Sequence, residues 1–453
     1  MGQHLNLTNP QGFHHHHFKM AEAVAGLWAA EEAVSTTAQL GVAAYMVSKP
    51  SMPLKGVFTQ IASASDDETR LSLARADHSL SIIGNKAFIF GGETAAGKLA
   101  TTDVHAITLA SADQPEPDYA LIPAVPDQKD GKLPVPRKKH AACAFNVCVA
   151  VFGGIDESGK VIDEGSTIWL FNTAKSTWET LQPSKCDDAA PRPRSGGKLF
   201  NLNNNLVLYG GHDVNGNVLK DVWEFDYVKK EWIHKQDAPV WSPNATLTEG
   251  VLYLISGHDE MSGDLHFMPL AISREEQEWH SVPFPTNPMT PGPKPRHGAG
   301  LVPISTGHGR HYLIYMLGAR EPGAVGSKTD DVPPPAEEGK PEEPQYWSDM
   351  WTYQLPSAMP APESQWNLSA AFNPASIKDS IRSALGYDSG QHSWSEIEVL
   401  PPPDLELMAG KVHPGPRGFF GCDVMEDGRN LVLWGGVNAK GEKEGDGWIV
   451  KLQ

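Results

Sequence analysis

The sequence of 453 residues contains few cysteines and no excess of positive charge. Its four cysteines include no Cys-x-x-Cys pair, which disfavours a zinc site and a disulfide framework and is typical of a reducing compartment. The formal net charge is −18, whereas proteins that bind nucleic acid or an anionic membrane present a broad basic surface. We therefore expect no nucleic-acid partner, and a membrane partner is disfavoured on the same ground.

The sequence also lacks the familiar signatures of catalysis and of export. It contains no P-loop, no Gly-x-Ser-x-Gly, no His-Glu-x-x-His and no dinucleotide-binding fingerprint. Residues 1–19 lack the layout of a signal peptide, and we expect a disordered extension or a tag-like segment and a cytoplasmic location. Residues 20–52 are rich in Ala and interrupted by Glu, which predicts an N-terminal helix and linker; attachment to a membrane surface is the alternative.

Turn-forming residues are abundant instead, with 43 Gly and 37 Pro beside 13 Trp, and this composition is typical of short strands joined by tight turns. The length suggests two or three domains unless the chain is built from repeats. Repeats are present. An apolar strand reaches a Gly pair at 91–92, 153–154, 210–211 and 435–436, with degraded copies at 256–257 and 317–318.

Each copy keeps further residues in register. Arg75, Arg137 and Arg194 precede the first Gly of their copies by 16 residues, and Arg296 and Arg417 precede the corresponding positions by 21 and 18 residues. An alternating segment such as KDVWEFD follows, and then a Trp, 21 to 24 residues past the second Gly in three copies. One repeat therefore predicts four short strands. Since a four-stranded sheet cannot bury both faces alone, the sheets are expected to stack around an axis with Trp between them.

The order of Arg, apolar-Gly-Gly, Asp-Val-Trp-x-Phe-Asp and Trp resembles the kelch repeat of the galactose oxidase/kelch superfamily, in which each repeat forms one blade of a β-propeller. The resemblance covers roughly residues 53–453 and implies an all-β, six-bladed propeller. The last copy ends without a Trp strand. The segment LKGVFTQIAS, with Phe58 at the Trp position, is expected to supply that strand and close the ring.

Two insertions fall in the fifth blade. Residues 321–345 are acidic and Pro-rich, which predicts a disordered loop; binding of a basic partner is the alternative. A short amphipathic helix is predicted over 374–386, with Pro374 in its first turn, Gly386 at its stop, and Ile377 and Ile381 on one face. We expect this helix to pack against a blade edge; docking of a partner is the alternative.

Propellers bind ligands along the axis and on their loop faces, so residues at the start of the inner strands are candidates for binding. The first set comprises Arg75, His78, Arg137, His140, Arg194, Arg296, His297 and Arg417. Five converging arginines would bind an anion or an acidic peptide. Because the Arg belongs to the repeat itself, the favoured interpretation is that it hydrogen-bonds carbonyls of the fold.

The second set of candidates follows the Gly turns and comprises His212, Asp213, His258 and Asp259. A His-Asp pair suggests metal binding or acid–base chemistry, but ordinary turn chemistry explains the Asp equally well and is favoured.

Two functions fit the sequence. The kelch resemblance implies a cytoplasmic, non-enzymatic interaction module that binds an unidentified protein or peptide through its loop face and needs no cofactor. The alternative is a small-molecule enzyme similar to the iron-dependent nitrile-specifier proteins, whose iron site follows the pattern Glu-x3-Asp-x3-His. Glu260 and Asp264 match that pattern, but His266 follows Asp264 by two residues instead of four. Iron belongs to this alternative only.

Overall fold

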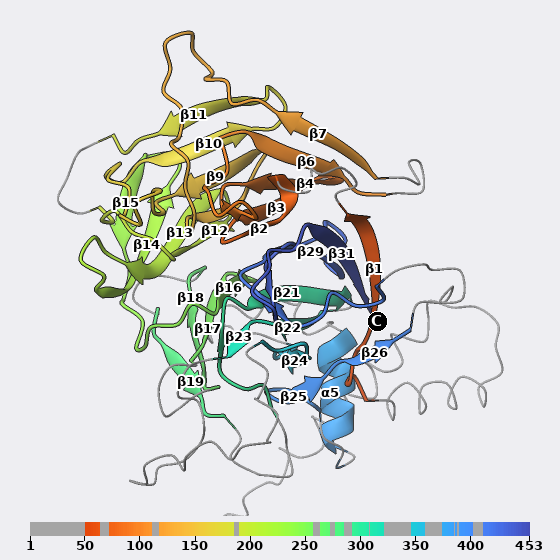
Figure 1. The fold of residues 1–453 in the computed structure, drawn as a ribbon. Helices are drawn as coiled ribbons and strands as arrows, with labels where there is room; N and C mark the ends of the chain where they lie inside the picture. The colour runs from red at the N-terminus through yellow and green to blue at the C-terminus, as the bar shows by residue number, and fades with distance from the viewer. Residues whose placement is uncertain are drawn as a thin grey trace, which may run out of the picture.

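In the computed structural model of this chain, the described residues are 50–63, 72–110, 117–184, 190–256, 263–271, 277–284, 292–307, 309–320, 346–357, 374–384, 386, 389–401 and 411–453. They form five sheets of four antiparallel strands and a sixth sheet of five strands, arranged around a central axis as the blades of a propeller (Figure 1). The six-bladed, all-β architecture expected from the repeats is confirmed. Segments 1–19 and 321–345 and the expected N-terminal helix lie outside the described residues.

Blades 1 to 5 each use their strands in chain order, from the innermost to the outermost, with a ribbon strand between the second and third strands of blades 1 and 5. Blade 1 contains β3 (Ser79–Ile83), β4 (Lys86–Phe90), β6 (Val104–Thr108) and β7 (Asp118–Ile122). Blade 2 contains β8 (Ala141–Phe145), β9 (Cys148–Phe152), β10 (Ile168–Asn172) and β11 (Thr177–Leu181). Blade 3 contains β12 (Lys198–Leu202), β13 (Asn205–His212), β14 (Val218–Asp226) and β15 (Glu231–His234).

Blades 4 and 5 follow the same order. Blade 4 contains β16 (Ala245–Thr248), β17 (Val251–Ile255), β18 (Leu265–Pro269) and β19 (His280–Val282). Blade 5 contains β21 (Gly300–Gly307), β22 (Arg310–Met316), β24 (Met350–Gln354) and β25 (Trp394–Glu396). Three two-stranded ribbons lie beside the blades: β2 (Arg75–Ala76) with β5 (Glu93–Thr94), β20 (Arg296–His297) with β23 (Ala319–Arg320), and β27 (Arg417–Gly418) with β30 (Val437–Asn438).

Blade 6 joins the two ends of the described chain. It contains β28 (Gly421–Val424), β29 (Asn430–Trp434), β31 (Asp446–Leu452) and β1 (Lys55–Ser63), and β26 (Glu398–Leu400) adds to β1 in parallel. Phe58 lies opposite Val450 in the register, is 1 % exposed, and contacts Trp448 edge-on with ring centroids 6.4 Å apart. The prediction that this N-terminal strand closes the ring is confirmed.

The hydrophobic core lies between the blades. The second strand of each blade is covered on both sides, so its residues form a continuous apolar run, and all five residues of β9 are buried. Trp178 in blade 2 is 1 % exposed and packs on Phe90 of blade 1 at a centroid distance of 4.8 Å and on Phe171 of its own blade at 5.2 Å. The repeat Trp therefore fills the space between sheets, as expected.

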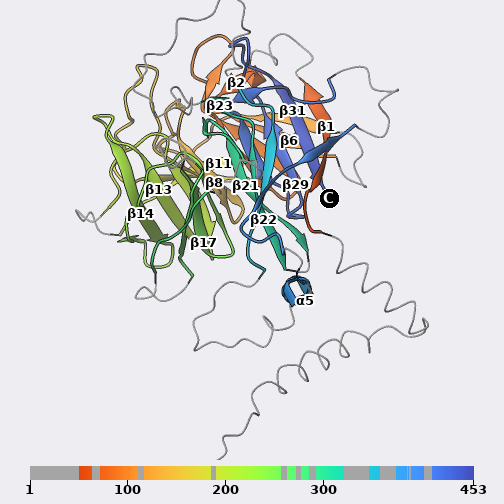
Figure 2. The ribbon, with the colours of Figure 1, turned by 90° about the horizontal axis from the view of Figure 1, so that it is seen from below.

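The helix predicted in blade 5 is present as α5 (Pro374–Ala384), with Gly386 just beyond it at φ +78°. It lies at the opposite end of the propeller from β2 and β23 (Figure 2). Its buried residues are Ala375, Asp379 and Arg382, whereas the two isoleucines of the predicted apolar face are only half-buried. The helix is anchored by an ion pair of Asp379 with Arg310 of β22, at 2.6 Å. No helix among the described residues is long and apolar enough to cross a membrane.

Candidate functional site: the axial channel and its mouth

The five repeat arginines lie inside the blades and are each 0–1 % exposed. Arg194 is typical: its Nη1 donates to the carbonyl of Gly210 at 3.1 Å, and Nη1 and Nη2 donate to the two carboxylate oxygens of Asp221 at 2.6 and 2.8 Å. The same bidentate arrangement recurs in Arg137–Glu164, Arg296–Asp349 and Arg417–Asp446. Arg75 differs, because its partners are the carbonyls of Ser72 and Gly91 and the ring of His105.

The acidic partners of these arginines were not singled out from the sequence, although a signal was present. In blades 3, 5 and 6 the acid lies two residues before a Trp, whose indole nitrogen donates to it, as in Asp221 and Trp223 at 2.7 Å. Each guanidinium donates hydrogen bonds within its own blade. The geometry therefore supports the interpretation that the arginines stabilise the fold rather than bind a ligand. None of them lines the central cavities.

The arginine backbone also joins neighbouring blades. The amide of Gly92 in blade 1 donates to the carbonyl of Arg137 in blade 2 at 2.8 Å. Equivalent bonds run from Gly154 to Arg194, from Gly318 to Arg417 and from Gly436 to Arg75. Gly92 has φ +88°, and a Cβ there would lie 2.7 Å from the carbonyl oxygen of Ala76, which explains why the second position of the pair requires Gly.

Two residues after each repeat Arg, the backbone adopts the left-handed αL conformation. The residues there are Asp77, Lys139, Gly196, Gly298 and Phe419, with φ between 54° and 68°. Their amides and carbonyls form a chain around the axis: Phe419 donates to Gly298 (2.7 Å), Asp77 to Phe419 (3.0 Å), Lys139 to Asp77 (3.0 Å) and Gly196 to Lys139 (2.7 Å). This chain of hydrogen bonds connects five blades and frames an opening.

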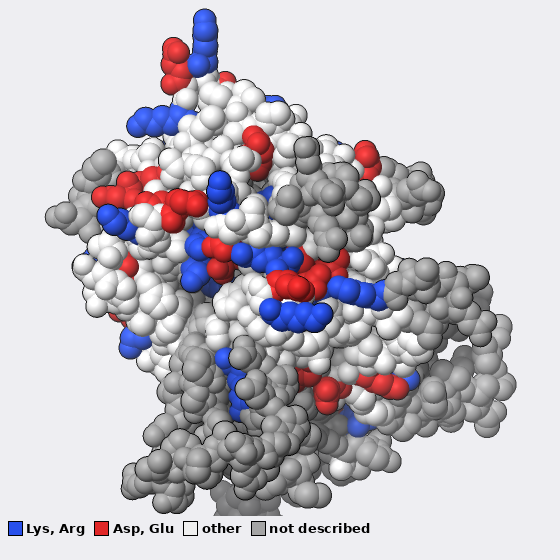
Figure 3. All heavy atoms as spheres, in the orientation of Figure 1, with Lys and Arg blue, Asp and Glu red and all other residues white. Residues whose placement is uncertain are grey.

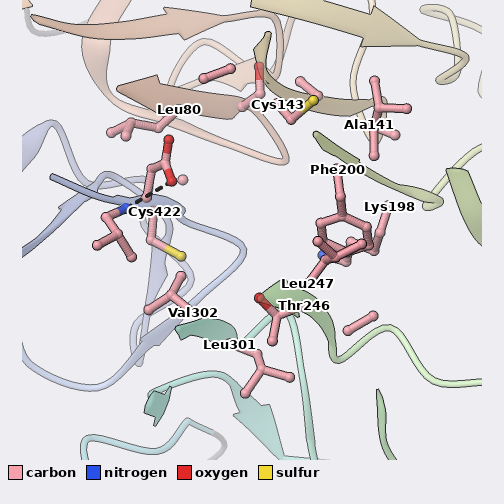
Figure 4. A pocket seen from close by; sticks show the side chains of 18 of the residues that line it. Leu80, Ala141, Cys143, Lys198, Phe200, Thr246, Leu247, Leu301, Val302 and Cys422 are labelled. Atoms are coloured by element: carbon pink, nitrogen blue, oxygen red, sulfur yellow. Dashed lines mark hydrogen bonds between the residues drawn. The ribbon is translucent and has the colours of Figure 1, made fainter. Parts of the chain in front are cut away.

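Two cavities that share His78, His140 and Lys198 in their linings lie along the axis. The axial channel, about 360 Å³, is walled by the inner strands, and Figure 4 shows side chains from different blades surrounding an open centre, among them Leu80, Cys143, Lys198, Leu301 and Cys422. The mouth is a wider recess of about 920 Å³ above it. Its lining includes Asp77, Lys139, Lys160, Trp241, Phe419 and Phe420. Acidic and basic side chains lie next to one another across the middle of the propeller face (Figure 3).

The histidine candidates lie at the boundary of channel and mouth. His78 and His140 line both cavities and His297 lines the mouth. Burial, followed by the nearby Arg137, lowers the pKa of His140 to about 3, and burial holds the pKa of His78 well below its ordinary value. Both imidazoles are therefore neutral, and each packs on the first Gly of a neighbouring blade's turn, His140 on Gly91 and His78 on Gly435.

Of the two His-Asp pairs, one lies among the described residues. His212 and Asp213 line the mouth. The Asp213 carboxylate accepts hydrogen bonds from the amides of Asn215 and Asn217, at 2.8 and 2.9 Å, so the turn chemistry considered from the sequence accounts for it. His258 and Asp259 lie outside the described residues.

The two described residues of the iron proposal, Asp264 and His266, do not line either cavity. Glu260 lies outside the described part of the chain. Asp264 is 6 % exposed and accepts a hydrogen bond from the amide of Phe284 at 2.7 Å, whereas His266 on β18 contacts the hydroxyl of Ser281 through Nδ1 at 2.7 Å. No group of three His, Cys, Asp or Glu side chains within the described residues could hold a metal ion. The iron-dependent small-molecule enzyme stays a prediction.

The residues that shape the mouth were mostly not singled out from the sequence. Lys139, Trp241, Phe419 and Lys198 have no common motif. Lys139 and Phe419 each lie two residues after a repeat Arg, in the αL conformation. This fixed spacing from the Arg is the signal that could have identified them. The fold and site together define a kelch-type propeller with a ligand-sized recess on its axis.

This chain belongs to the kelch-repeat family, since the KLHDC2/KLHL20/DRC7 Kelch-repeats domain matches residues 77–316, more than half of its length. The dynein alpha chain of the flagellar outer arm of Chlamydomonas reinhardtii is 26 % identical over 152 residues, which are 33 % of this chain and 3 % of the dynein. The N-(sulfonatooxy)prop-2-enimidothioate sulfolyase of Thlaspi arvense is 30 % identical over 107 residues, 23 % of this chain and 29 % of the sulfolyase. The chain thus spans a small part of these relatives.

Among solved structures, that of YjhT superposes with a TM-score of 0.52 at 14 % sequence identity, covering 84 % of this chain and 97 % of YjhT. At this identity the similarity concerns the fold alone.

Proposed function

We propose that this protein is an interaction module that binds a segment of a partner protein in the mouth of its axial channel. The observation that carries the proposal is the αL backbone of Asp77, Lys139 and Phe419, which line the mouth. A non-Gly residue in this conformation costs about 1 kcal/mol or more, and such strain is typical of functional surfaces. The equivalent residues Gly196 and Gly298 avoid that cost.

The size and lining of the mouth support the proposal. A recess of about 920 Å³ lies within the range of volumes that bind ligands in other proteins. Its aromatic residues Trp241 and Phe419 offer apolar anchors, and Lys139 and Asp77 offer charges that select an orientation. Kelch-repeat propellers typically bind proteins, and membership of this family supports the proposal.

The test uses substitutions that remove a side chain but suit the backbone. In Lys139→Gly and Phe419→Gly the αL conformation is retained, so loss of binding is separated from loss of the fold. Proteins captured from native lysate by the full chain and by both variants are compared by quantitative mass spectrometry, and binding is then measured by calorimetry with the purified partner. Lys175→Ala, on an exposed loop of blade 2, is the control.

We expect at least tenfold weaker binding for both glycine variants and unchanged binding for the control. Partners that bind the two variants as tightly as the unmodified protein would overturn the proposal.

A second candidate function, a small-molecule enzyme, rests on the 30 % identity to the sulfolyase over 107 residues. Its test is the iron content of the purified full chain and of Asp264→Ala, measured by inductively coupled plasma mass spectrometry. One iron per chain that is lost in Asp264→Ala is the result that would favour the enzyme.

A further inference from the structure

Lys198 places a positive charge inside the axial channel. It is the first residue of β12 and lines both the channel and the mouth. Among the described residues that line both cavities, it alone carries a charge, since the two histidines there are neutral. Figure 4 shows its side chain running toward the open centre beside Phe200. Lys198 is half-buried, and burial lowers the pKa of its ammonium group.

Other interior cations of the described residues have close partners, which are carboxylates for most of them and carbonyls for Arg75. Arg310 pairs with Asp379, Lys235 with Glu224 at 2.8 Å, and Lys443 with Glu93 at 2.6 Å. Lys198 has no carboxylate within ion-pair distance in the described part of the chain; burial lowers its pKa by more than the thiol of Cys422 and then the carboxylate of Asp77 raise it from longer range. A poorly hydrated ammonium without an anion is costly, and this cost is offset when an anion binds.

We propose that Lys198 receives an acidic side chain, Asp or Glu, of the partner segment that enters the mouth. This inference rests on the proposed function and adds the chemistry of the ligand. The channel of about 360 Å³ accommodates a group of this size, and Leu80 and Leu301 on its wall strengthen a charge pair locally, while Asp423 lies on the wall formed by blade 6. Lys139 at the rim is exposed and offers a second ammonium to an acidic segment.

A random peptide library is the probe that tests the proposal. Random 12-residue peptides displayed on phage are selected on the full chain, and the most enriched peptides are synthesised and titrated by fluorescence anisotropy. Lys198→Met removes the charge and keeps the length of the side chain, Lys198→Arg keeps the charge, and Lys86→Met on the exposed β3–β4 hairpin is the control. Thermal unfolding of each variant confirms that it is folded.

We expect Asp or Glu at one register in the selected peptides, with binding at least tenfold weaker for Lys198→Met. Lys198→Arg should remain within a few-fold of the unmodified protein, and Lys86→Met should be unchanged. Neutral or basic peptides that bind Lys198→Met with full affinity but fail to bind Lys139→Gly would overturn this inference and leave the proposed function standing.

A second arm distinguishes a protein segment from a small free acid. Thermal unfolding is measured with succinate and with inorganic phosphate, on the unmodified protein and on Lys198→Met. If no peptide binds but succinate stabilises only the unmodified protein, Lys198 keeps its anionic ligand and the proposed function fails. If neither peptide nor small anion depends on Lys198, the inference is overturned.

Discussion

Arg194 and Asp221 form a bidentate ion pair inside blade 3, with nitrogen–oxygen distances of 2.6 and 2.8 Å, while the carbonyl of Arg194 accepts a hydrogen bond from Gly154 of blade 2 at 2.9 Å. One residue thus holds its own blade together and contributes to the contact with the preceding blade. Removing the guanidinium leaves a carboxylate that is largely screened from water. We expect Arg194→Ala to lower the free energy of unfolding by about 3–5 kcal/mol.

The measurement is urea unfolding followed by tryptophan fluorescence. Arg192→Ala is a matched control, because Arg192 lies two residues away and is exposed, and its expected effect is within about 0.5 kcal/mol. Similar losses in both variants would contradict the role assigned to the pair.

Closure of the ring depends on Phe58. Its ring is 1 % exposed and lies 4.3 Å from the ring of His413 and 6.4 Å from that of Trp448, measured between centroids. We expect Phe58→Ala to lower the free energy of unfolding by about 3–5 kcal/mol, because it leaves a cavity between β1 and its neighbours. Lys55→Ala on the exposed end of the same strand is the control, and thermal unfolding is the measurement. An unchanged melting temperature for Phe58→Ala would show that β1 does not stabilise blade 6.

Asp423 gives the stability of the protein a pH dependence. Burial raises the pKa of its carboxyl group to about 6, although the amides of Ile82 and Val424 donate hydrogen bonds to it. A raised pKa means that the protonated form suits the folded state, so the stabilising contribution is complete below about pH 4 and is lost as the pH rises through 6. We expect Asp423→Asn to stabilise the protein by about 1–2 kcal/mol at pH 8 and much less at pH 4.5.

Melting temperatures of both proteins between pH 4.5 and 8 provide the measurement, with Asp130→Asn on an exposed loop as the control. If Asp423→Asn raised the melting temperature by the same amount at every pH, the raised pKa of Asp423 would be contradicted.

The anchor of α5 is the ion pair between Arg310 and Asp379. Burial alone would raise the pKa of Asp379, but hydrogen bonds from Arg310 and Gln391 outweigh it and lower the pKa. We expect Asp379→Ala to reduce the hydrogen-exchange protection of α5 by about a hundredfold, since about 3 kcal/mol of buried pairing is removed, while the inner strands keep their protection. Ser380→Ala, at an exposed position of the helix, should change neither. Equal protection of α5 in Asp379→Ala would place its anchor elsewhere.

The repeat predicted the fold well because its signals are local. Gly at a positive φ, an apolar second strand and a Trp on the last strand are each required within one blade, so their spacing is visible along the chain. Phe58 could be assigned to the last blade because that copy visibly lacked a strand. The helix of blade 5 was predicted nearly to its ends, but its packing was not, since the buried Asp379 has a partner 69 residues away.

The candidate site was predicted less completely. The repeat arginines lie four residues before the inner strands rather than in them, and four of the five guanidinium groups turn into the blades toward acids 27 to 53 residues further on. The sequence by itself determined the blade, its turns and the order of the ring, because these depend on contacts between residues near one another in the chain. Tertiary structure decided which side chains reach the axis, and Lys198 is one of them. The residues that line the channel around Lys198 come from the five other blades as well as its own. Because they are far apart in the chain, no sequence spacing predicts that they meet.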